Sequence, residues 1–122
     1  MNTDKKKIIL VDDSHYHLLS TKEKLKGQYE IYPAESAAIM FNILSNVIPD
    51  LILLDINMPE VDGFETIKQL KAAPHYAKIP VIFLTAINDK YSIAEGMARG
   101  AVDFISKPFS DSTLIECIEK YI

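Results

Sequence analysis

The stretch from Leu51 to Glu65, which reads LILLDINMPEVDGFE, constrains the fold of this chain more than any other segment. Its four consecutive apolar residues, Leu51 to Leu54, end in a carboxylate, Asp55. A short apolar run without alternation is typical of a strand covered on both faces, as in a parallel sheet. Ligands bind to such sheets outside the carboxyl ends of the strands, so we expect Asp55 to be presented at that edge.

The rest of the chain alternates between strand-like and helix-like segments. Strands are predicted at residues 8–11, 29–34, 51–54, 80–84 and 101–105, and helices at about 15–26, 35–46, 63–72, 88–99 and after Ser110. In the first helix, Leu18, Leu19 and Leu25 are expected to face the core. The alternation, without internal linker or repeat, predicts one α/β domain spanning residues 1–122, with a doubly wound parallel sheet and helices on both faces.

Composition narrows the class of protein. With 13 Lys and Arg against 17 Asp and Glu, the net charge of −4 argues against a nucleic-acid-binding face. The single cysteine, Cys117, excludes an intrachain disulfide and a cysteine-based metal site, and we expect it to be a small buried apolar residue. The apolar run at residues 8–11 is shorter than the ~7–15 residues of a signal peptide core. No segment approaches the ~20 apolar residues of a membrane span, so a cytoplasmic protein is expected.

Polar groups follow four of the predicted strands. They are Asp12 and Asp13, Asp55, Thr85 and Lys107. An aspartate after a strand is usually a cap or turn residue, but all of these groups are expected at one edge of the sheet. Their joint presence therefore indicates a site.

Neighbouring strands lie about 4.8 Å apart, so the carboxylates would converge. Two unit charges at about 5 Å repel by roughly 3 kcal/mol at an effective dielectric of about 20, and this repulsion needs compensation. Mg²⁺ is the simplest candidate, because it prefers oxygen ligands. Zinc is not expected, since no histidine or cysteine is predicted near these strand ends. A carboxylate, a metal, a lysine and a hydroxyl around one point describe a phosphoryl-transfer site with an aspartate nucleophile.

These motifs resemble those of the response-regulator receiver domains of two-component signalling. The matching segments are VDDS at 11–14, LLDINMPEVDGFE at 53–65, LTA at 84–86 and GAVDFISKPF at 100–109. The likeness covers essentially the whole chain. It implies a single receiver domain with a flavodoxin-like fold of five strands in the order 2-1-3-4-5.

The resemblance also implies roles for individual residues. Asp55 is similar to the phosphoacceptor aspartate. The metal ligands implied are the carboxylates of Asp12, Asp13 and Asp55 and the backbone carbonyl of Asn57. The implied cofactor is Mg²⁺.

The same likeness implies a switch. Thr85, Ala86 and Lys107 match the residues that contact the phosphoryl group, and the Lys107–Pro108 bond is one that the family often has in cis. Thr85 and Phe104 match the switch hydroxyl and the switch aromatic, although an aromatic residue in a strand is more often plain core. A phosphohistidine on a histidine kinase or a phosphotransfer protein would be the donor. A downstream effector would read the face built by the fourth helix, the fifth strand and the fifth helix.

Two other functions would use some of the same residues. A Mg²⁺-dependent phosphohydrolase would place its nucleophile in an Asp-x-Asp after the first strand, whereas Asp12 and Asp13 are adjacent and the candidate nucleophile follows the third. A phosphate-independent pseudo-receiver scaffold is disfavoured by the intact set of polar groups. Turnover of an external substrate is therefore not expected. His15 and His17 follow the acidic pair and are interpreted as helix-surface residues without a role. The domain is expected to act either alone or as part of a longer protein.

Overall fold

The computed structural model describes residues 5–55, 63–86 and 90–122. The strands are β1 (Lys6–Val11), β2 (Tyr29–Ala34), β3 (Leu51–Asp55), β4 (Val81–Ala86) and β5 (Asp103–Lys107). The helices are α1 (His15–Leu25), α2 (Ala37–Leu44), α3 (Gly63–Ala72), α4 (Lys90–Ala98) and α5 (Asp111–Glu119). Strands and helices alternate along the chain, as predicted, and none of the described helices is long and apolar enough to cross a membrane.

All strand pairs in the sheet are parallel, and the strand order is β2-β1-β3-β4-β5. This confirms the expected fold class and order. The register places Val11 opposite Leu54 and Asp55 opposite Leu84. Because all strands run in the same direction, their carboxyl ends form one edge, and there the residues at the ends of β3, β4 and β5 meet those that follow β1.

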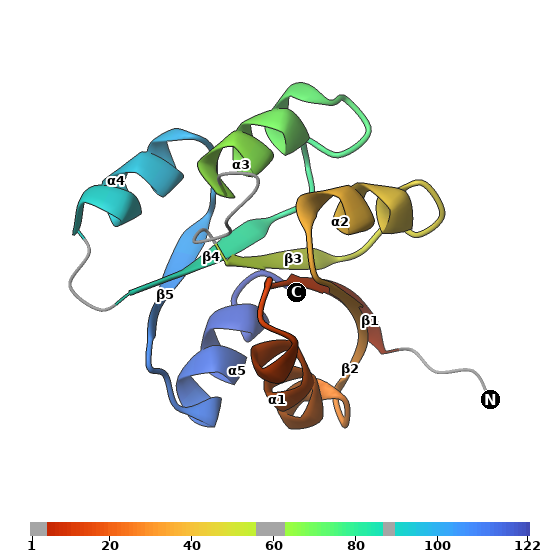
Figure 1. The fold of residues 1–122 in the computed structure, drawn as a ribbon, viewed down its shortest axis with the longest axis vertical. Helices are drawn as coiled ribbons and strands as arrows, with labels where there is room; N and C mark the ends of the chain where they lie inside the picture. The colour runs from red at the N-terminus through yellow and green to blue at the C-terminus, as the bar shows by residue number, and fades with distance from the viewer. Residues whose placement is uncertain (1–4, 56–62, 87–89) are drawn as a thin grey trace.

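Helices cover both faces of the sheet. In Figure 1, α1 and α5 lie on one face, and α2, α3 and α4 lie on the other. Successive strand residues point to opposite faces, so Ile9 packs in a cluster with Ile67 of α3, whereas Ile8 packs with Leu18 of α1 and Leu114 of α5. The whole of β3 is buried, which explains its unbroken apolar run.

Serine side chains begin three of the helices. Ser14, Ser36 and Ser110 each accept a hydrogen bond from a backbone N–H of the helix that follows. These bonds satisfy backbone N–H groups that have no partner within the first turn of a helix. The cap at Ser14 matters for the site, because it starts α1 directly after Asp12 and Asp13.

Two local predictions were wrong. Leu19 is 52% exposed, because Leu18 and Leu25 lie two turns apart on the buried face of α1 and Leu19 is turned away from it. The fifth strand begins at Asp103 rather than at Ala101. The backbone N–H groups of Gly100 and Ala101 still donate to carbonyls of α4, and Gly100 has the positive φ of 118° that ends the helix.

Candidate functional site

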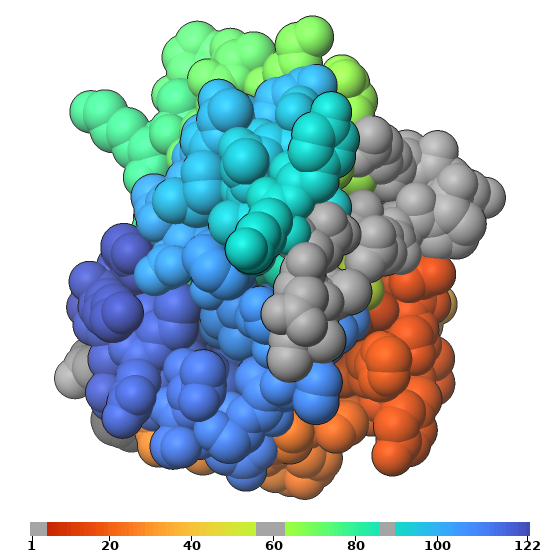
Figure 2. Space-filling model, turned by 90° about the vertical axis from the view of Figure 1, so that its left-hand side faces the viewer, coloured from red at the N-terminus to blue at the C-terminus, as the bar shows by residue number. Residues whose placement is uncertain are grey.

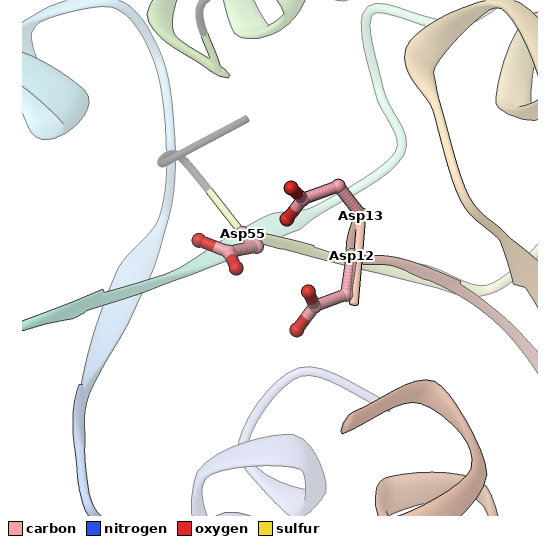
Figure 3. A group of neighbouring side chains, drawn as sticks. All are labelled: Asp12, Asp13 and Asp55. Atoms are coloured by element: carbon pink, nitrogen blue, oxygen red, sulfur yellow. The ribbon is translucent and has the colours of Figure 1, made fainter. Parts of the chain in front are cut away.

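Three carboxylates gather at the carboxyl edge of the sheet. Asp12 and Asp13 follow β1 and Asp55 ends β3, and one oxygen from each lies within 4.8 Å of the others. Figure 3 shows the three side chains grouped at the ends of these two strands. Asp12 and Asp55 are only 3% and 4% exposed, whereas Asp13 is exposed. The group is thus an acidic pocket with a buried floor and one carboxylate at its rim.

Burial and charge act together on Asp12. Burial, chiefly, and the neighbouring Asp55 raise the pKa of the Asp12 carboxyl, whereas the backbone N–H of Ser14, 2.9 Å from Asp12 Oδ1, and Lys107 lower it. The net shift is upward, so the pocket holds its negative charge at a cost in free energy. A bound cation would relieve that cost.

Lys107 supplies a positive charge from β5. Its Nζ donates to Asp55 Oδ2 at 3.0 Å and lies 3.6 Å from Asp12 Oδ2. The ammonium group therefore contacts both buried carboxylates at once. The Lys107–Pro108 peptide bond is cis.

Thr85 contributes a buried hydroxyl. The residue is fully buried in β4, and its Oγ1 has no hydrogen-bond partner among the described residues. It follows Leu84, which pairs with Asp55 in the sheet register. A buried hydroxyl without a partner costs about 1–3 kcal/mol, and such a group is a candidate for contact with a ligand.

The remaining predicted site residues are Phe104, Ala86 and Asn57. Phe104 is half-buried in the cluster beneath α2, α3 and α4, with its ring centroid 6.1 Å from that of Phe83. It pairs with Phe83, two positions before Thr85, so its backbone does not lie level with the carboxylates. Ala86 pairs with Lys107 in the sheet, and Asn57 lies outside the described residues.

His17, for which the sequence predicted no role, lies beside the acidic pocket. His17 Nδ1 is 3.8 Å from Asp12 Oδ2, so the expectation that no histidine lies near these strand ends is wrong. The signal was present in the cap: Ser14 Oγ accepts from the His17 N–H at 3.3 Å, which keeps the first turn of α1 beside Asp12. His15, in contrast, points to Glu35, with 2.9 Å between its Nδ1 and Glu35 Oε2.

The donor set fits a hard divalent cation. The three carboxylates provide oxygens close enough to share one ion, and oxygens are the ligands that Mg²⁺ prefers. Lys107 contacts the same carboxylates, and Thr85, whose hydroxyl has no partner within the described part of the chain, follows the residue that pairs with Asp55. A cation and a hydrogen-bond donor so placed suit an incoming anionic group such as a phosphoryl.

Comparisons with known proteins show the family and the fold. Residues 8–119 match the family model of the response regulator receiver domain. The chain is 34% identical to the chemotaxis protein CheY of Listeria monocytogenes over 93% of this chain and 96% of that protein. The chemotaxis response regulator CheY4 of Vibrio cholerae has the same fold, with a TM-score of 0.90 and 28% identity over 97% of this chain and 99% of that one.

Some relatives are much longer. The chain is 42% identical over 84% of its length to a protein of Vibrio cholerae described as a probable cyclic di-GMP phosphodiesterase, but it covers 23% of that protein. It spans about a quarter of the length of the first curated relatives that it matches. The similarity is therefore to one part of such proteins.

Proposed function

The chain belongs to the response regulator receiver domain family, whose members are phosphorylation-dependent switches, and from that premise we propose that Asp55 is the residue that accepts the phosphoryl group. Residues 1–122 would act as one receiver domain. The observation that carries the proposal is the contact of Asp55 with Lys107 at 3.0 Å, inside a group of three carboxylates.

The chemistry is a transfer between two nucleophiles. An oxygen of the Asp55 carboxylate forms a bond to phosphorus, and the phosphorus–nitrogen bond of a phosphohistidine donor breaks. The electron pair of that bond returns to the donor's imidazole nitrogen. The carboxylates of Asp12, Asp13 and Asp55, with the backbone carbonyl expected from Asn57, would hold Mg²⁺. When bound, the ion offsets the negative charge of the carboxylates and of the phosphoryl group.

Lys107 and Thr85 then respond to the new charge. The Lys107 ammonium, which already lies 3.6 Å from Asp12 and 3.0 Å from Asp55, pairs with a phosphoryl oxygen. The Thr85 hydroxyl, buried without a partner among the described residues, donates to another, and the backbone of Ala86 lies beside the group. Shifting a two-state equilibrium from 1:99 to 99:1 takes about 5.5 kcal/mol. Two or three hydrogen bonds to a charged group, at about 1.5–3 kcal/mol each, supply that order of energy.

The readout would be the face formed by α4, β5 and α5. Figure 2 shows these elements as one continuous surface. Phe104 lies on β5 and packs on Phe83, two residues before Thr85 on β4. In this proposal its ring turns when Thr85 moves toward the phosphoryl group. A groove of about 390 Å³ runs between β5 and α5 on this face. A downstream protein that binds there would distinguish the two states.

The partners follow from this chemistry. The donor would be a histidine kinase or a histidine phosphotransfer protein, and a cytoplasmic location suits a donor that draws on ATP. We expect no turnover of an external phosphomonoester and no contact with nucleic acid by this domain. A phosphohydrolase would instead turn over such a substrate at rates of about 1 s⁻¹ or more.

Incubation with acetyl phosphate and Mg²⁺, followed by intact-mass measurement, tests the proposal. We expect the mass of one phosphoryl group, mapped to Asp55 and absent from Asp55→Asn. The matched control is Asp111→Asn, which removes an exposed carboxylate that pairs with Lys24 and should leave the labelling unchanged. Labelling of a folded Asp55→Asn variant at the wild-type level would refute the assignment.

A further inference from the structure

We propose that His17 adds an imidazole nitrogen to the acidic pocket, so that this pocket binds Zn²⁺ more tightly than its carboxylates alone would allow. The inference rests on the proposed function in one respect, since it takes Asp12, Asp13 and Asp55 to be the carboxylates that hold a divalent cation. It goes further in naming a side chain of α1 that determines which cations the pocket prefers.

The position of His17 is set by the start of α1. The Ser14 N–H donates to Asp12 Oδ1 at 2.9 Å, and Ser14 Oγ accepts from the His17 N–H at 3.3 Å. One serine thus ties the backbone of His17 to the carboxylate of Asp12. The His17 Nδ1 faces the other oxygen, Asp12 Oδ2, at 3.8 Å.

The distance suits two ligands of one ion. Two atoms bound to the same Zn²⁺ at about 2.1 Å lie roughly 3–4 Å apart. The His17 nitrogen stands outside the group formed by the three carboxylates, so coordination requires the ring to turn toward them. The side chain is 54% exposed, and the ring that it contacts, that of Tyr16 at 5.8 Å between centroids, is itself exposed, so the imidazole has room to turn.

The chemical consequence concerns selectivity. Carboxylate oxygens suit Mg²⁺, which prefers an all-oxygen shell, whereas imidazole suits zinc. A pocket with three carboxylates and one imidazole is therefore expected to bind both ions through Asp12 and to use His17 only for zinc. His15 is the natural comparison, because it is in the same turn of α1 but its Nδ1 pairs with Glu35 at 2.9 Å.

The test measures metal binding directly by calorimetry, with Zn²⁺ and with Mg²⁺ as separate probes. The proteins are the wild type, His17→Gln, His15→Gln and Asp12→Asn, at a pH of about 8, where most imidazoles are neutral. We expect His17→Gln to weaken Zn²⁺ binding by about 10-fold or more and to leave Mg²⁺ binding unchanged. His15→Gln should change neither, and Asp12→Asn should weaken both. The ring resonances of His17 should shift with Zn²⁺ and not with Mg²⁺.

Three results would overturn the inference. They are equal Zn²⁺ affinity in His17→Gln and wild type, an equal loss of both ions in His17→Gln, and Zn²⁺ binding that survives in Asp12→Asn. The second result would mean that His17 merely orients Asp12. The proposed function is tested separately by labelling of Asp55 with acetyl phosphate and Mg²⁺, so either proposal can fail while the other stands.

Discussion

Lys107 Nζ lies 3.0 Å from Asp55 Oδ2, although the two residues are 52 positions apart in sequence and their strands, β3 and β5, are not neighbours in the sheet. The lysine side chain crosses the end of β4 to reach the carboxylate. In doing so it also comes within 3.6 Å of Asp12 Oδ2. Before any cation or phosphoryl group binds, this one ammonium compensates the two buried carboxylates.

Replacing that lysine should therefore raise the affinity for Mg²⁺ and lower the stability of the metal-free protein. In Lys107→Met the carboxylates lose their internal cation, so we expect tighter Mg²⁺ binding. In metal-free protein the free energy of unfolding should fall by roughly 1–3 kcal/mol, less than for a fully buried pair because the lysine side chain is 30% exposed. Mg²⁺ titration and urea unfolding in the presence of a chelator measure the two effects.

Lys24→Met provides the comparison for this variant. Lys24 pairs with Asp111 at 3.3 Å on the surface, so its removal should change stability by less than about 1 kcal/mol and leave Mg²⁺ affinity as it is. If Lys107→Met bound Mg²⁺ no better than the wild type, the ammonium would not be competing for these oxygens.

Asp12→Asn should stabilise the metal-free protein in a pH-dependent way. The pKa of Asp12 is raised above its ordinary 3.8, mainly by burial of the carboxyl and to a smaller extent by the charge of Asp55. The stability that this group contributes is thus present below pH 3.8 and is lost as the pH rises through its folded-state pKa. The variant should match the wild type at low pH and exceed it in unfolding free energy at neutral pH by on the order of 1 kcal/mol, since it removes first the burial of a charge and then its repulsion with Asp55.

Urea unfolding across a pH series, with a chelator present, measures that difference. Added Mg²⁺ should stabilise the wild type and not Asp12→Asn. A variant less stable than the wild type at neutral pH would show that the pairing of Asp12 with Lys107 outweighs the burial of its charge.

Thr85→Val should separate stability from signalling. Valine has nearly the shape of threonine and lacks the hydroxyl that is buried without a partner among the described residues. We expect the unphosphorylated protein to gain about 1 kcal/mol in unfolding free energy. Asp55 should still be labelled by acetyl phosphate, but the amide NMR shifts at α4, β5 and α5 that follow labelling should be lost.

Thr85→Ser serves as the control here, because it keeps the hydroxyl. It should lose stability through the missing methyl group and retain the NMR response. A full response in Thr85→Val would remove the hydroxyl from the switch.

Gly96→Ala should destabilise the contact between α4 and the sheet. A Cβ at Gly96 would collide with the Phe83 ring, which also packs against Phe104, so the ring or the helix must shift. We expect a loss of roughly 1–3 kcal/mol in the free energy of unfolding by urea. Gly27→Ala, where a Cβ meets no atom within 4 Å, should be neutral or slightly stabilising. Equal stability of the two variants would contradict the close packing of α4.

Much of the fold could be predicted because its signals are local. An unbroken apolar run at Leu51 to Leu54 predicts a strand buried on both faces, and Ser14 and Ser110 mark helix starts through hydrogen bonds within one turn. The errors arose where tertiary contacts decide. Leu19 is as apolar as Leu18, and only the orientation of α1 against the sheet leaves it exposed.

The sequence by itself determined which chemical groups stand at the carboxyl edge, because each lies at the end of an apolar run that forms a strand, as Asp55 does after Leu54. Only the tertiary structure decided how they meet, with the Lys107 ammonium in contact with both Asp55 and Asp12. The physical reason is the distance along the sequence over which each interaction acts. Strand and cap signals act over a few residues, whereas these contacts depend on strand order, register and the direction of each side chain, which arise only when the whole sheet is assembled.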